Sequence, residues 1–277
     1  MDQGLVDWLQ AEVPERRVYA RPPLALALCQ VRFATRFGLN DSTVAPFQEA
    51  LEGDYPNPER QQQVAAIQVG GQAGQIGLQA PGSETLWKFT DETGDWTVTL
   101  TQDFVTLETR AYAHFDDFLA RLHRVLEILD RTIRPRVGRR IGLRYINEIR
   151  STNRDWSEII QRELLGALVI HPIRDSTEQA IQVLTLRAKE ARINLQHGVF
   201  PTGTTVVPKP GLRVPIEPFY LIDIDMYQEF SPPKSLKMEP LIISEYVEEY
   251  HATISMLFRW ATTDEYRASL GEHDDGR

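Results

Sequence analysis

The sequence predicts an α+β protein made of two similar halves. Each half runs from a strand through a short helix and several strands to a long amphipathic helix, and many of the strand segments alternate apolar and polar residues. With 277 residues, the chain can bury a substantial core. We place the boundary near Pro135-Arg136 and interpret the pattern as an internal duplication. The expected organisation is a helical appendage at 1–21, lobes at 22–135 and 136–265, and a flexible acidic tail at 266–277.

The first half is expected to hold one buried strand, an antiparallel meander and a long helix with an apolar stripe. The short helix between them should be capped by Ser42 or Thr43. Gly70, Gly71 and Gly74 indicate a hairpin turn, because no phosphate-loop motif or helix follows them. The predicted elements are a helix at 5–13, a strand at 24–33, a helix at 43–51, strands at 63–69, 75–79, 85–89, 96–100 and 104–110, and a helix at 114–134.

The second half repeats this order with different residues. Its loop at 198–215 is long and rich in glycine and proline, which is typical of a segment that binds a partner or lacks fixed structure. The predicted elements are a strand at 139–150, a helix at 156–168, strands at 179–188 and 191–197, the loop, a strand at 219–227 and a helix at 240–262.

Composition narrows the functional classes. The formal net charge of −9 argues against a protein that holds duplex DNA by charge alone. One cysteine, Cys29, excludes an internal disulfide and a cysteine-based metal cage. The six histidines lack metal-site spacing, and no known catalytic motif is present, so we expect neither a metal nor a cofactor. The sequence shows no apolar span or signal peptide, so we expect a cytoplasmic protein that does not bind membranes.

Several short motifs are distributed from residue 20 to residue 265. They are Pro22-Pro23-Leu24 before a strand ending Val31-Arg32-Phe33, Trp87-Lys88-Phe89, Leu107-x-Thr109-x-x-Tyr112-x-x-Phe115, Arg140-x-Gly142-Leu143-Arg144-Tyr145-Ile146-Asn147 and Ile222-Asp223-Ile224-Asp225. This series resembles a sporadically distributed prokaryotic family of uncharacterised proteins of similar length. The resemblance implies no activity or site residue. The patchy distribution of the family is similar to that of genes in mobile or defence clusters.

Arginine is concentrated in the strand predicted at 139–150. Because side chains alternate along a strand, Arg140 and Arg144 should share one face, and Tyr145 and Asn147 should lie on the other. Arg144 and its neighbours, including Arg139, could bind a phosphate or carboxylate through the planar guanidinium fork. The alternative is that Arg144 pairs with an acid inside the protein, and we prefer this second interpretation.

Asp223 and Asp225 are two residues apart in a predicted strand and should therefore project from the same face. Such a pair could hold a divalent cation or act as acid and base. It could equally provide the partners of Arg144 and Arg140. We favour the ion pairs, because they account for both charged clusters without a ligand.

Three functions follow from these features. The first is a non-catalytic binding protein that acts as an adaptor, regulator or subunit through contacts with a protein partner. The second is binding of RNA, single-stranded DNA or a nucleotide by the strand at 139–150, with Tyr145 and Trp156 stacking on bases. The third is a divalent-metal-dependent hydrolase that uses Asp223 and Asp225. We favour the first, because no catalytic constellation accompanies the abundant ordered structure.

Overall fold

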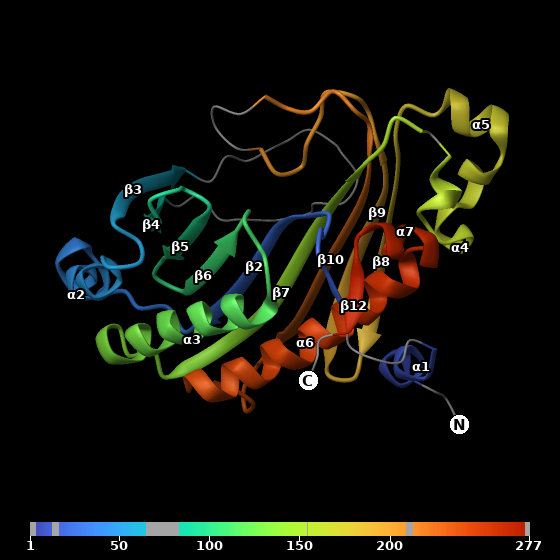
Figure 1. Ribbon diagram of the computed structural model, residues 1–277. Coiled ribbons are helices and arrows are strands. Elements are labelled where there is room, and N and C mark those ends of the chain that lie inside the picture. Colours follow the sequence, from blue (N-terminus) through green and yellow to red (C-terminus); the bar gives the residue numbers. More distant parts are fainter. Residues whose placement is uncertain (1–3, 13–16, 65–82, 154, 209–212, 275–277) are drawn as a thin grey trace.

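Ten strands form one antiparallel sheet in the computed structural model (Figure 1). The structure describes residues 4–12, 17–64, 83–153, 155–208 and 213–274. The turn and strand predicted between residues 65 and 82 lie outside these described residues. The strands of the sheet are β2 (Leu24–Phe33), β3 (Asn57–Val64), β4 (Ser83–Thr90), β5 (Trp96–Leu100), β6 (Phe104–Thr109), β7 (Val137–Arg150), β8 (Ala180–Ala188), β9 (Ala191–Phe200), β10 (Phe219–Glu229) and β11 (Leu236–Lys237).

The order of the strands is symmetric about the middle of the sheet. β2 and β7, the first long strands of the two halves, pair with each other at the centre. Each is flanked on its other side by the last long strand of its own half, β6 or β10. The full order is β3-β4-β5-β6-β2-β7-β10-β9-β8, with the short β11 beside β7. The predicted α+β class is confirmed. The two halves share one continuous sheet, and their origin by duplication stays a prediction.

Helices cover one face of the sheet. The two long helices, α3 and α6, lie side by side across this face, and α2 packs against α3 (Figure 1). α6 also contacts the central strands β7 and β10. The helices are α1 (Leu5–Glu12), α2 (Asp41–Leu51), α3 (Phe115–Thr132), α4 (Arg162–Leu165), α5 (His171–Ser176), α6 (Pro240–Ala261) and α7 (Asp264–Ser269).

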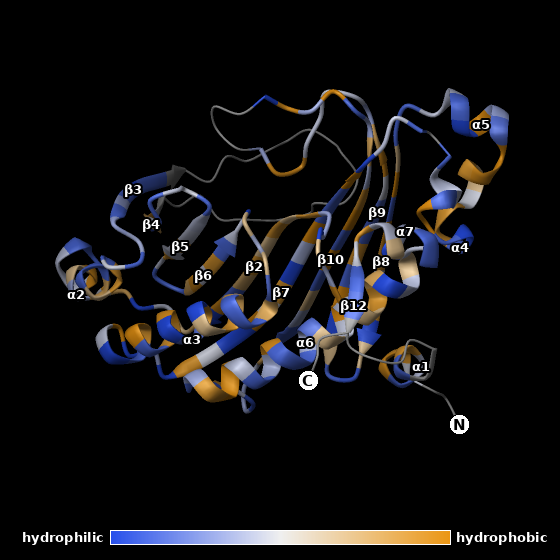
Figure 2. Ribbon diagram, viewed as in Figure 1, coloured by the Kyte–Doolittle hydropathy of each residue, from blue (hydrophilic) through white to orange (hydrophobic). Residues whose placement is uncertain are grey.

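The core lies between these helices and the sheet. Alternate residues of the central strands, such as Cys29, Leu143 and Ile224, are fully buried there. Their neighbours point to the opposite face, which we call the open face, and apolar and polar residues therefore alternate along β7 and β10 (Figure 2). None of the described helices is long and apolar enough to cross a membrane.

Several predicted boundaries are wrong. The cap of α2 is Asn40, whose Oδ1 accepts hydrogen bonds from the backbone N–H groups of Ser42 and Thr43. The strand expected from residue 63 begins at Asn57. It includes Pro58, which an edge strand tolerates because one side of the strand needs no backbone donor. The loop after β9 begins only at residue 201, so Gly198 is part of β9.

The helix predicted at 156–168 is divided into short pieces. Trp156–Glu158 and Gly166–Val169 form 3-10 turns on either side of α4. Gly166 adopts a φ of 52°, which a continuing right-handed helix cannot accommodate. The apolar spacing that suggested one helix is still used, since Trp156 and Leu164 are buried.

The two ends of the described chain are joined by a small second sheet. β1 (Arg17–Tyr19) pairs with β12 (Glu272–Asp274), so residues 264–274, which include most of the tail predicted to be flexible, form α7 and β12. Arg267 of α7 is buried and donates to the backbone carbonyl of Thr262. This arrangement holds the C-terminal residues against the body of the protein.

Candidate functional site

The two predicted ion pairs are present on the open face. Arg144 of β7 donates to Asp223 of β10 through two bonds, Nε to Oδ1 at 2.8 Å and Nη2 to Oδ2 at 2.6 Å. Arg140 donates from Nη2 to Asp225 Oδ2 at 3.2 Å. The register places Asp225 directly opposite Arg144, so Arg144 reaches diagonally to Asp223 and leaves Asp225 to Arg140.

Gly142 leaves room for the Arg140 side chain beside it. It lies in β7 directly opposite Tyr227 of β10, and a Cβ atom at this position would lie 2.9 Å from Arg140 Nη1. Without that atom, the Arg140 side chain crosses the position of Gly142 and reaches Asp225. The guanidinium group also lies 4.5 Å from the centre of the Tyr227 ring and donates to Gln30 Oε1 at 3.3 Å. The glycine of the Arg-Ile-Gly-Leu-Arg motif therefore provides space for a neighbouring arginine.

Burial affects both ion pairs. Asp223 is 5% exposed, whereas the side chain of its partner Arg144 is 43% exposed. The hydrogen bond to Asp223 raises the pKa of Arg144 despite partial burial. Burial raises the pKa of Asp225, although Arg140 and Arg144 act in the opposite direction. The pair Arg144–Asp223 thus lies at the border between core and solvent.

Three of the predicted site residues lie away from these ion pairs. Tyr145 is buried on the helix-covered face, where its hydroxyl lies 2.9 Å from Nδ1 of His251 in α6. Asn147 is buried on the same face and donates to the Ile222 carbonyl at 3.1 Å. Arg139 lies near the beginning of β7, and its backbone carbonyl accepts a hydrogen bond from the Phe230 N–H. Tyr145 and Asn147 therefore cannot form one binding surface with Arg140 and Arg144.

A second group on the open face, which the sequence did not reveal, holds the loop after β9. Glu148 accepts hydrogen bonds from Thr205 Oγ1 at 2.6 Å and from the Val206 N–H at 2.8 Å. Arg150 pairs with Glu148 and donates to the Thr204 carbonyl at 3.1 Å. The same loop packs Val206 and Val207 on a small apolar cluster of Ile146, Phe219 and Leu221. The loop predicted to be a docking segment is thus fixed to the sheet along residues 204–207.

The arrangement of the carboxylates does not favour metal chemistry. Among the described residues, no group of three or more His, Cys, Asp or Glu side chains is arranged to hold a metal ion. Both Asp223 and Asp225 face arginines, whose positive charge repels a cation. Cys29 is fully buried, which raises the pKa of its thiol to about 12 and keeps it protonated.

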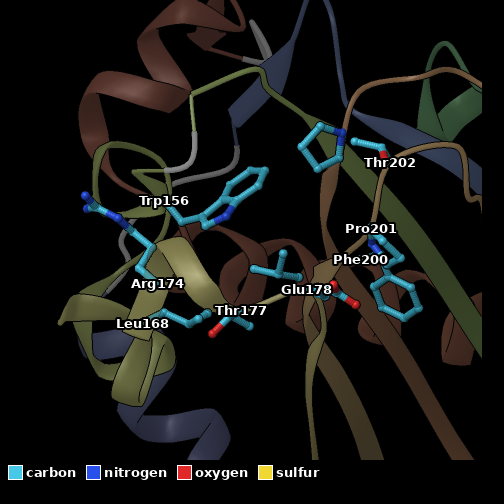
Figure 3. Close-up of a pocket in the computed structure, with 10 residues that line it drawn as sticks. Trp156, Leu168, Arg174, Thr177, Glu178, Phe200, Pro201 and Thr202 are labelled. Carbon is cyan, nitrogen blue, oxygen red and sulfur yellow. The ribbon is translucent and has the colours of Figure 1, made fainter. Parts of the chain in front are cut away.

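A pocket of about 320 Å³ lies between the short helices after β7 and the ends of β9 and β10 (Figure 3). Its wall combines apolar residues, such as Trp156, Leu168 and Phe200, with polar residues, such as Thr177, Glu178 and Thr202. Trp156 is 2% exposed, so its ring is not free to stack on a base as the sequence had suggested. Arg174 points away from the pocket in Figure 3 and pairs with Asp155 at 2.7 Å. The pocket thus has a mixed polar and apolar lining.

The edge of the sheet at β8 exposes apolar side chains. Within the described part of the chain, β8 pairs along its whole length with β9 and with no other strand. Ile181, Val183 and Leu184 are 42%, 57% and 38% exposed. At Gly198 of β9, a Cβ atom would lie 1.9 Å from the Ala180 carbonyl oxygen, so only glycine allows the two strands to approach this closely. The sequence predicted the strand but not its position at an edge.

Comparison with models of known protein families gave no match, and a search of curated proteins found no similar sequence.

Proposed function

We propose that the chain is a non-catalytic cytoplasmic binding protein, acting as an adaptor, regulator or subunit, and that a partner protein binds along the edge of β8. The supporting observation is the exposed apolar edge of this strand. An edge strand presents unpaired backbone N–H and C=O groups, and apolar side chains beside them make it a template for another strand. The open face supports this function because its acids Asp223 and Asp225 are held in ion pairs with arginines.

The opposite edge of the same sheet provides an internal comparison. β3 carries Pro58, Glu59 and Arg60, and these three residues are exposed. Proline and charged side chains are the usual features that prevent an edge strand from pairing with another protein. β8 has no proline, and its single charged residue, Arg187, lies near its end. The two edges of one sheet thus differ in the way expected if only β8 binds a partner.

The side chains of β8 indicate the chemistry of the partner. A segment adding to the edge in extended conformation would gain backbone hydrogen bonds, and its side chains would lie beside those of β8. Ile181 and Val183 on the open face favour apolar or β-branched residues in the partner. Arg187, exposed near the end of the strand, favours an acidic residue. The resemblance to a patchily distributed prokaryotic family is consistent with a partner encoded in the same mobile or defence gene cluster.

The experiment compares two lysine substitutions at the two edges. Val183→Lys places a charge on β8, and Gln62→Lys places the same side chain on the exposed β3 edge. Native protein is purified with its partner, and cross-links from Lys189, at the β8–β9 turn, are mapped by mass spectrometry. We expect Val183→Lys to abolish co-purification and these cross-links, while Gln62→Lys retains both.

Three outcomes would contradict the proposal. A partner that is retained by Val183→Lys would bind elsewhere. Self-association abolished by Val183→Lys, measured by sedimentation, would make a second copy of the chain the occupant of the edge. A turnover activity lost in Asp223→Ala or Asp225→Ala would show that the protein is an enzyme.

A further inference from the structure

At one end of the sheet, exposed arginines without an ion-pair partner among the described residues accompany an exposed aromatic ring. We call this surface the basic end and define it by Arg32, Arg36, Phe37 and Arg136. It lies where β2 ends and β7 begins, away from the β8 edge (Figure 1). Its partner is therefore argued independently of the function proposed above.

Backbone hydrogen bonds bring these residues together. After β2, the Ala34 N–H donates to the Val137 carbonyl at 2.8 Å, so the chain continues beside the beginning of β7. The Arg36 N–H donates to the Gln102 carbonyl at 2.7 Å, which fixes the next residues against the β5–β6 turn. Ala34, two residues before Arg36, is therefore hydrogen-bonded to the residue that directly follows Arg136.

The arginines of the basic end differ from those farther along β7. Arg140, Arg144 and Arg150 are all in ion pairs with acids of the same face. In the described part of the chain, neither Arg36 nor Arg136 has an acidic group within 4.0 Å.

Arg32 is exposed and lies 5.8 Å from the centre of the Phe104 ring. Among the nearby acids, Asp103 accepts a hydrogen bond from the Thr101 hydroxyl at 3.0 Å, and Glu229 is exposed at the end of β10. Within the part of the chain that the structure describes, exposed arginines without an ion-pair partner thus gather here, although the formal net charge of the chain is −9.

Phe37 is 86% exposed, the highest value among the large apolar side chains of the described residues. A single phenylalanine beside arginines provides a flat surface on which a base can stack, and guanidinium groups bind phosphates through paired donors. We propose that the basic end binds single-stranded nucleic acid, with a base on Phe37 and phosphates at Arg36 and Arg136.

Two other polyanionic partners fit this surface less well. Duplex DNA keeps its bases stacked internally, so Phe37 would have no face to contact, and the acidic remainder of the chain would repel the duplex. An anionic membrane is usually bound by several apolar side chains inserted together, whereas Phe37 is the one strongly exposed apolar residue of the basic end. Binding of RNA or single-stranded DNA, which the sequence suggests for the strand at 139–150, is here proposed for residues before that strand and after β2.

The test measures fluorescence anisotropy of labelled dT20 and U20 with the full chain and its variants at several salt concentrations. Phe37→Ala should weaken binding about 5- to 150-fold, the range expected for loss of one base stack. The double variant Arg36→Ala/Arg136→Ala should lower the slope of log affinity against log salt by about 1.4, corresponding to two phosphate contacts. Arg213→Ala and Ile216→Ala, exposed substitutions in the loop at the other end of the sheet, should leave affinity unchanged.

Several results would overturn the proposal. These are absence of binding at low salt, equal losses in the control variants, or binding of a 20-base-pair duplex that is as tight as dT20 and insensitive to Phe37→Ala. Phe37-dependent binding to phosphatidylserine vesicles without binding to either oligonucleotide would identify a membrane as the partner instead. Circular dichroism establishes that each variant is folded. None of these outcomes depends on Val183, so failure here leaves the function of β8 to be judged separately.

Discussion

Removing Arg144 should destabilise the protein mainly by leaving Asp223 buried and unpaired. Asp223 is 5% exposed, and Arg144 is the side chain that donates to both of its oxygens. Removing one partner of a fully buried pair costs about 3–5 kcal/mol, but the Arg144 side chain is 43% exposed, so part of this cost is screened by solvent. We therefore expect Arg144→Ala to lower the free energy of unfolding by about 2–3 kcal/mol.

A second substitution separates this mechanism from simple loss of packing. Asp223→Asn retains the shape of the side chain and removes its charge, so alone it should cost about 1 kcal/mol. In the double variant Arg144→Ala/Asp223→Asn, no buried charge is left, and the protein should be more stable than with Arg144→Ala alone. The assay is urea unfolding followed by tryptophan fluorescence, with Arg192→Ala as a control for loss of an exposed arginine.

Two results would refute this reasoning. The first is a cost for Arg144→Ala that equals the cost for Arg192→Ala, expected to be below about 0.5 kcal/mol. The second is a double variant whose loss is the sum of the two single losses, since additivity would mean that Arg144 and Asp223 do not interact. If the pair is structural, folded Arg144→Ala should still bind its partner at temperatures below its unfolding transition.

Three further predictions concern buried titratable groups. Because burial raises the pKa of Asp225, the folded state binds a proton there more readily than the unfolded chain does. The free energy of unfolding should therefore fall as the pH rises through the range just above about 3.9. Urea titrations of Asp225→Asn should lack this pH dependence, and an equal slope in the variant would contradict the prediction. Burial lowers the pKa of His197, so the unfolded chain takes up a proton at a higher pH than the folded chain does. The free energy of unfolding should therefore decline below about pH 6.5, and less steeply in His197→Asn. Identical profiles of stability against pH for the two proteins would rule this out. Finally, Cys29, with its pKa raised to about 12, should resist Ellman's reagent when folded and react fully in urea, whereas rapid reaction of native protein would show that the strand opens.

Local patterns were sufficient to predict much of the fold. Alternation in β7 and β10 placed Arg140, Arg144, Asp223 and Asp225 on one face, because the period of a strand does not depend on distant contacts. The register between the two strands depends on long-range pairing. Neither segment alone could therefore predict that Arg144 pairs with Asp223, which is diagonal to it, and not with the residue directly opposite. The same limit applies to Glu148, whose hydrogen bonds to the Thr205 hydroxyl and the Val206 N–H join segments more than fifty residues apart.

The errors also have identifiable physical causes. The apolar spacing from Trp156 to Leu168 satisfies a helical period, yet Gly166 adopts a positive φ and ends the helix after a short run. The position of β8 at an edge depends on the absence of a neighbouring strand, and a strand's own residues do not specify its neighbours. The cap at Asn40 was missed because three consecutive polar residues, Asp41, Ser42 and Thr43, all follow it and all suit a helix start.

The pairing of β2 with β7 has a consequence for the covalent connection between the halves. The two central strands hold the halves of the sheet together through their own hydrogen bonds, in addition to the covalent connection between Thr132 and Val137. Two separately expressed fragments divided at this connection should therefore reassemble, each completing the unpaired central strand of the other. If the halves arose by duplication, this seam is where two copies of a shorter ancestral chain would have met as a symmetric dimer.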